Sequence, residues 1–155
     1  MLGEEADEAD EAETETPRYD VAERDLREAE HFIGGAILAG DLDVSHPLGF
    51  GYSDRLLPLM RQGAHTLTRP DGDPYAVPVQ YEEEVLLAGY VSERRQGELA
   101  GTPAVVTRRL GQGSIVLIAD NPLFRGTFVG TERLFANAVF FSGLIDNARG
   151  LYEED

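Results

Sequence analysis

Apolar side chains recur at helical spacing in two parts of this chain. The segment "DVAERDLREAEHF" places them three and four positions apart, which predicts a helix over residues 20–32. Asp20, with Glu23 three residues later, is typical of a capping box at the start of that helix. The same spacing in "GTERLFANAVFFSGLIDNA" predicts a second helix capped by Thr131. The aromatic residues of this second helix are expected in the core: Phe135, Phe140 and Phe141.

Runs rich in β-branched residues predict strands elsewhere. Residues 104–107 and 114–119 form two such runs joined by "LGQG", a pattern typical of an antiparallel hairpin. Because residues 115–119 are apolar throughout, the second strand is expected at the centre of the sheet, covered on both faces. A shorter strand is expected at 36–39, and residues 53–63 are expected to form one or two helical turns.

The alternation of these elements predicts one α/β domain over residues 17–152, in three layers around a mixed sheet. Residues 1–16 are acidic and of low complexity, with almost no large apolar side chain. Such a segment buries too little surface to offset its ordering entropy, so a disordered tail or linker is expected there.

The net charge of −16 argues against nucleic acid or an anionic membrane as a partner, since both bind basic surfaces. All 13 basic residues are arginine, and an acidic surface without lysine also fits halophilic, salt-rich surroundings. The chain has no cysteine, which excludes a disulfide, a thiolate nucleophile and cysteine-ligated zinc.

Common catalytic motifs are absent from the sequence. There is no G-x-S-x-G nucleophile elbow and no phosphate-binding G-x-x-x-x-G-K-[ST] loop. None of the three histidines, His31, His46 and His65, is followed three residues later by glutamate, so no zinc-binding H-x-x-E pair exists. We therefore assign no catalytic residue and no metal ligand.

Four polar residues remain as candidates for ligand binding: His46, Asp120, Asn121 and Arg125. The last three follow the run at 114–119, and ligands of α/β sheets bind beyond strand ends. These loops would suit a small-ligand-binding module, or a degenerate hydrolase that uses the same groups as acid and base. Structural roles are the commoner alternative: backbone hydrogen bonds for His46, an Asx turn at Asp120 and Asn121, and a carboxylate partner for Arg125.

Three motifs then occur in order along the chain: "HPLGFGY" at 46–52, "ADNPLFRG" at 119–126 and "GTERLF" at 130–135. With the sequence around them, from about residue 33 to 142, they resemble the C-terminal region of bacterial zinc carboxypeptidases, the family of carboxypeptidase A. In that family a zinc peptidase domain precedes a domain similar to class I glutamine amidotransferases, which lacks the amidotransferase nucleophile.

The resemblance implies that this chain is a non-catalytic accessory domain whose partner is the peptidase domain of the same polypeptide. It implies zinc for that peptidase domain, no cofactor for this chain, and a secreted or periplasmic location. The implied fold is glutamine-amidotransferase-like and flavodoxin-like, either whole or only its C-terminal part. A C-terminal part alone would leave a sheet edge or an apolar face uncovered, and a homodimer through that face is expected.

Overall fold

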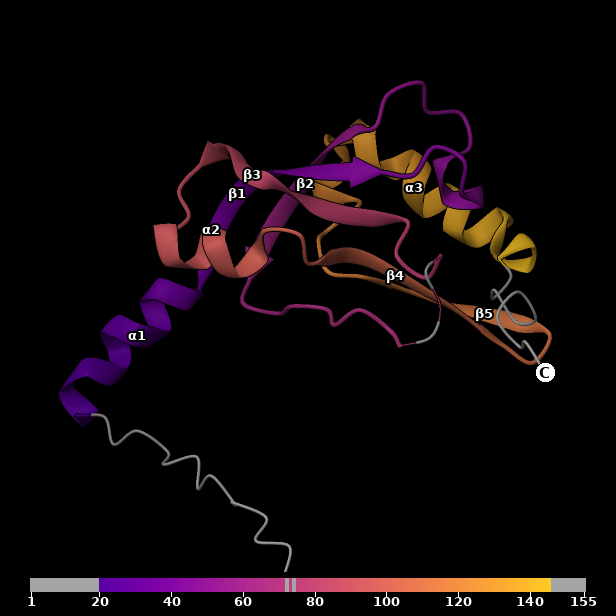
Figure 1. Cartoon of the computed structure of the whole chain (residues 1–155). Coiled ribbons are helices and arrows are strands. Elements are labelled where there is room, and N and C mark those ends of the chain that lie inside the picture. The colour runs from indigo at the N-terminus through magenta and orange to yellow at the C-terminus, as the bar shows by residue number, and fades with distance from the viewer. Residues whose placement is uncertain (1–19, 72, 74, 146–155) are drawn as a thin grey trace, which may run out of the picture.

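The computed structural model describes residues 20–71, 73 and 75–145, which form one curled antiparallel sheet with three α-helices around it (Figure 1). The strands are β1 (Ile33–Leu42), β2 (Leu56–Gly63), β3 (Val79–Gly89), β4 (Pro103–Leu110) and β5 (Gly113–Ile118). The helices are α1 (Arg24–His31), α2 (Glu93–Leu99) and α3 (Val129–Phe140), with one-turn helices η1 (Val21–Glu23), η2 (Pro47–Gly49), η3 (Phe124–Gly126) and η4 (Ser142–Leu144). The tail predicted at 1–16 lies outside the described residues.

The strand order is β2-β1-β3-β4-β5, and every neighbouring pair is antiparallel. The described residues thus combine helices with a sheet, which confirms the general α/β class that the sequence predicts. The predicted mixed sheet and the flavodoxin-like class are wrong for the described residues, because a flavodoxin-like sheet is parallel and doubly wound. Local hydrophobic patterns specify strands but not their direction, and this is the source of the error.

The curled sheet nearly closes on itself. The backbone N–H of Asn121, just after β5, donates to the carbonyl of Met60 in β2 at 3.1 Å. This bond connects the chain leaving one edge strand to the strand at the opposite edge. α3 packs against β2 and η2, so it covers the place where the two edges approach (Figure 1). The core residues fully buried inside include Leu38, Leu59, Tyr81, Val105 and Leu134.

The predicted hairpin is confirmed as β4 and β5, paired in register from Val105 opposite Ile118 to Leu110 opposite Gly113. The expected central position of the second strand is wrong, because β5 is the last strand in the sheet. Its alternate side chains Ile115 and Leu117 are 42% and 49% exposed. An apolar run therefore marks an edge strand with an uncovered outer face in this chain.

Residues 53–63 form β2 and not helical turns. Leu57 and Leu59 are buried while Leu56 is exposed, so burial follows the two-residue period of a strand. Pro58, which suggests a short helix in the sequence, is compatible with an edge strand because its missing N–H costs no bond there. Pairing with β1, from Ala39 opposite Pro58 outward, overrides the local helical spacing.

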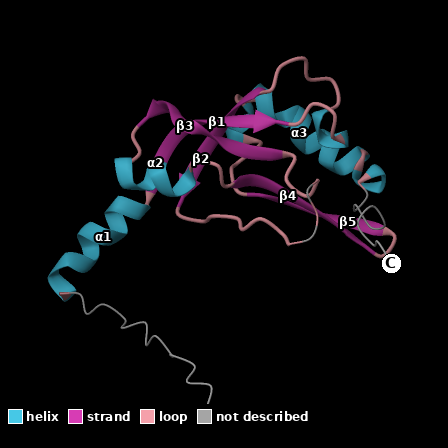
Figure 2. Cartoon of the chain, viewed as in Figure 1, coloured by secondary structure: helices cyan, strands magenta, loops and turns pink. Residues whose placement is uncertain are grey.

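α1 begins and ends as the sequence predicts, but its apolar residues are uncovered. The Asp20 carboxylate accepts from the N–H of Ala22 at 3.0 Å and caps the helical segment. No residue of α1 is buried, and Figure 2 shows the helix extending away from the sheet with α2 beside it. The side of α1 toward α2 is polar, as in the His31 to Glu98 contact at 3.3 Å.

α3 starts earlier than predicted, and its outer face is apolar. Thr131 lies inside the helix and not at its cap, and its hydroxyl donates to the carbonyl of Pro122 at 2.7 Å. Leu134 and Asn137 are buried beneath the helix. Phe135 and Phe140 are 40% and 80% exposed, so the prediction that they lie in the core is wrong. Helical spacing identifies an apolar helix but does not show which of its faces is covered.

Candidate functional site

The loop that carries "HPLGFGY" is shaped by local side-chain hydrogen bonds. The Asp43 carboxylate accepts from the backbone N–H of Ser45 at 2.9 Å and from its hydroxyl at 2.6 Å. The Nδ1 atom of His46 accepts from the N–H of Leu48 at 3.1 Å and caps η2, which has Pro47 in its first turn. Short polar side chains and a proline thus turn the chain sharply after β1.

His46 takes the structural role that the sequence offered as the alternative to ligand binding. Its Nδ1 atom accepts a hydrogen bond, so the neutral ring carries its proton on Nε2. Burial lowers the pKa of His46, and the charges of Asp43 and Asp73 oppose that shift. The neutral imidazole is therefore the form that fits this loop.

Polar side chains of α3 hold the same loop. The Asn137 amide donates to the carbonyls of Leu48 and Phe50 at 2.8 and 2.9 Å. The Tyr52 hydroxyl donates to the carbonyl of Gly130 at 2.6 Å. The structure therefore brings together two motifs that lie about 80 residues apart in the sequence, "HPLGFGY" and the start of "GTERLF".

An exposed apolar surface lies where this loop meets the end of α3. We call it the aromatic face, and it consists of Val44, Pro47, Phe50, Phe140, Phe141 and Leu144. It contains hollows of about 430 and 300 Å³ that share the rings of Phe50 and Phe141. These two rings meet edge to face, with centroids 5.2 Å apart and an angle of 69°.

The hollow of about 430 Å³ has a cation at its rim, Arg133. The guanidinium lies over the Tyr52 ring, 5.7 Å from its centroid, and its Nη1 atom donates to the carbonyl of Gly51. From the sequence, Phe140 and Phe141 are expected in the core and the other residues of the aromatic face have no assigned role. For Arg133 the sequence leaves two alternatives open, recognition of an anionic ligand and pairing with a carboxylate. Apolar residues on every side of the last helix indicate that the helix has more apolar surface than one covered face, but they do not show which of these residues stay exposed.

Asp120 is not at the sheet edge in contact with solvent but buried inside the curled sheet. Its carboxylate accepts from the Tyr81 hydroxyl at 2.7 Å and lies 3.4 Å from Nη1 of Arg61. Arg61 is fully buried, and its Nε and Nη2 atoms have no hydrogen-bond partner in the described part of the chain. Burial raises the pKa of Asp120, and it also raises the pKa of the Tyr81 hydroxyl. The sequence alone does not predict that Arg61, Tyr81 and Asp120 contact one another.

Asn121 and Arg125 each contact a residue close to them in the sequence. The Asn121 side chain accepts from the N–H of Leu123 at 3.1 Å, which is the predicted Asx turn. Arg125 has a positive φ of 54° and lies over the Phe124 ring, 5.0 Å from its centroid. Among the described residues, no hydrogen bond or ion pair joins His46, Asp120 and Arg125 to one another.

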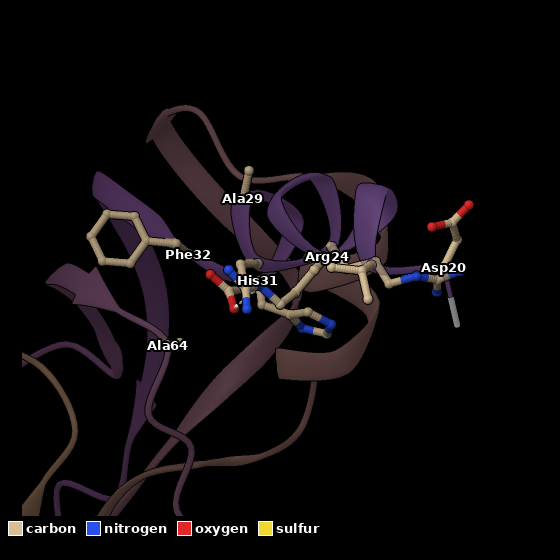
Figure 3. A pocket seen from close by; sticks show the side chains of 9 residues that line it. Asp20, Arg24, Ala29, His31, Phe32 and Ala64 are labelled. Atoms are coloured by element: carbon tan, nitrogen blue, oxygen red, sulfur yellow. Dashed lines mark ion pairs between the residues drawn. The ribbon is translucent and has the colours of Figure 1, made fainter. Parts of the chain in front are cut away.

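A third hollow, of about 770 Å³, lies along α1 (Figure 3). Val21 and Phe32 contribute its apolar wall, and Arg24 and His31 contribute polar groups, with Ala64 after β2 at its far side. Arg24 lies 3.6 Å from the carboxylates of both Asp25 and Glu28, so the local charges are already balanced. This hollow is wide, but each basic side chain that lines it already has a carboxylate neighbour.

Within residues 20–71, 73 and 75–145, no three acidic, histidine or cysteine side chains gather as a metal site would require. The same residues include no helix with the length and apolar character needed to cross a bilayer. Comparison with family models, with curated proteins and with solved structures gives no match to this chain. The geometry of the aromatic face is therefore the main guide to function.

Proposed function

We propose that this chain is a non-catalytic accessory domain of a zinc carboxypeptidase-like protein, and that the aromatic face packs against the peptidase domain of the same polypeptide. The observation that carries the proposal is the exposure of Phe50, Phe140 and Leu144, which are 66%, 80% and 67% accessible to water. Contiguous apolar surface of this kind marks interaction sites, and aromatic residues are enriched in them.

Two of the motifs that resemble the carboxypeptidase family also build this face. "HPLGFGY" supplies Pro47 and Phe50, and "GTERLF" supplies Arg133 and lies in the helix that ends at Phe140, with Phe141 directly after it. The amidotransferase-like part of the resemblance refers to a parallel sheet, which the described strands do not form. The proposal therefore relies on the motifs and the exposed face, and it places zinc in the peptidase domain.

The coding sequence upstream of this segment is the first test. We expect an H-x-x-E motif and a later histidine in the same reading frame, as a zinc peptidase requires. A continuous reading frame without such a domain would contradict the proposal.

The second test measures binding between that peptidase domain and this chain, produced as separate polypeptides, by isothermal titration calorimetry. We expect Phe140→Asp to weaken binding by about 30-fold or more, the effect of removing a central aromatic contact. Tyr90→Asp is the matched control, because Tyr90 is 81% exposed and lies outside the aromatic face. An equal loss of affinity in both variants would contradict the proposal. A face that binds a second copy of this chain and not the peptidase domain would also contradict it.

A further inference from the structure

Arg133 is a positioned cation that has no carboxylate partner among the described residues of this strongly acidic chain. The sequence has 29 acidic and 13 basic residues, and three exposed arginines of the described residues, Arg24, Arg55 and Arg94, lie beside carboxylates. Arg55, for example, donates twice to Asp41, with both distances 2.7 Å. Arg133 instead donates to the Gly51 carbonyl and lies over the Tyr52 ring, and no carboxylate is within ion-pair distance of it among the described residues.

The position of Arg133 is fixed by groups that do not neutralise it. A backbone carbonyl and a phenol ring orient the guanidinium but leave its full charge, and Nε and Nη2 remain as donors. Phe50, Phe140 and Phe141 line the same hollow of about 430 Å³. An anion held by Arg133 would therefore lie beside apolar rings.

The neighbouring hollow of about 300 Å³ adds one donor to an otherwise mainly apolar lining. His46 lines it, and its Nδ1 atom is already occupied by the N–H of Leu48. Its Nε2–H is thus the group left to donate, and it carries no charge. The two hollows together present one cation, one neutral donor and several aromatic rings, which suits a ligand that is both apolar and acidic.

We propose that the aromatic face binds a polypeptide segment in which a carboxylate lies next to an apolar side chain. The carboxylate is held by Arg133, and the apolar side chain packs between the rings of Phe50, Phe140 and Phe141. This inference rests on the proposed function and specifies the chemistry of the partner segment. A second copy of the chain is the poorer occupant, because association would bring two net charges of −16 together.

The experiment uses two peptides that differ in one group, acetyl-Gly-Phe-Leu-Glu-Phe-Gly-amide and the same peptide with glutamine for glutamate. Each is titrated into the ¹⁵N-labelled full chain at low salt, and binding is followed by amide shifts in the NMR spectrum. We expect the acidic peptide to bind about fivefold more tightly, the scale of one exposed ion pair, and to shift the signals of Gly51 and Asn137.

Two variants separate charge recognition from apolar packing. Arg133→Gln is expected to abolish the preference for the acidic peptide, while Phe140→Ser is expected to weaken both peptides equally. Arg125→Gln is the matched control, because Arg125 also lies over a phenyl ring but does not line either hollow of the face. If Arg133→Gln fails to fold, Arg133→Lys replaces it, and we expect a retained but weaker preference.

Three results would overturn the inference. Equal binding of the two peptides, with loss in Phe140→Ser, would show an apolar docking face that does not select a carboxylate, and the proposed function would stand. Loss of the preference in Arg125→Gln would place the anion site beyond β5. Absence of binding by either peptide at millimolar concentration would show that the face does not take such a segment.

Discussion

At the scale of single residues, Arg61 and Asp120 form a buried ion pair, and removing both charges from water costs free energy. Both side chains are removed from water, and within the part of the chain that the structure describes the charged pair has the Tyr81 hydroxyl and the Ala119 carbonyl as its only further partners. The sequence marks Asp120 as unusual, because it ends an apolar strand. It gives no sign of Arg61, since the strand that contains it could be placed only after its pairing with β1 was known.

We predict that Asp120→Ala lowers the free energy of unfolding by about 3 to 5 kcal/mol, because it leaves the buried Arg61 guanidinium without a counterion. Urea denaturation of the two proteins at neutral pH measures the difference. The double variant R61M with D120L should recover most of the loss, since well-packed apolar residues replace buried ion pairs at little cost. Asn121→Ala, at the exposed neighbouring position, is expected to cost far less, and an equal cost would argue against the ion pair.

At the scale of elements, two helices, the β4–β5 hairpin and part of β1 were predicted from the sequence, whereas β2 was not. The β4–β5 hairpin was predicted because its turn and both strands adjoin in sequence. β2 was not, because the same leucine spacing fits a helical turn, and only β1 selects the strand. The aromatic face was missed for a related reason, since the helical period of α3 cannot show that its outer side stays uncovered.

The stability of the short helix η2 is expected to depend on pH through its cap, His46. His46 caps it through a neutral Nδ1, and burial holds the pKa of His46 below its usual value of about 6.5. The unfolded chain therefore takes up this proton first as the pH falls. The free energy of unfolding is expected to decrease from about pH 6.5 downward, toward the lower pKa of the folded state.

Urea midpoints measured between pH 7.5 and 5.5 test this expectation. His46→Asn keeps a capping side chain but does not titrate, so its stability is expected to fall less over that interval. Asp43 and Asp73 act on His46 in the opposite sense, and both are present in the variant and in the original protein, so the comparison isolates the effect of His46. A variant that follows the same pH profile as the original protein would rule out His46 as the source.

At the scale of the whole molecule, negative charge and uncovered apolar surface occur together. β3 contains three consecutive exposed glutamates, Glu82 to Glu84, where its pairing with β1 is interrupted. Repulsion between these negative charges destabilises the folded state, and added salt screens it. The composition alone predicts this repulsion, whereas the location of the apolar face required the structure.

We therefore expect the melting temperature to rise as potassium chloride is increased from 0.1 to 2 M. The triple variant E82Q, E83Q and E84Q is expected to be more stable than the original protein at low salt and to gain less from added salt. Differential scanning calorimetry measures both effects. A melting temperature that does not rise with salt, or a triple variant with the same salt response, would contradict this account.

The near-closure of the sheet also constrains how the chain reaches its native state. Arg61 and Asp120 lie 59 positions apart in sequence, and the bond from Asn121 to Met60 spans a similar length. Bringing such distant segments together carries a large loop-closure entropy, whereas the β4–β5 hairpin closes over a short turn. The hairpin thus suits an early step of folding, and the joining of β2 to the end of β5 suits a late one. Until that step is complete, a charged arginine and a row of apolar side chains on β2 face solvent, and this intermediate is where aggregation would compete with folding.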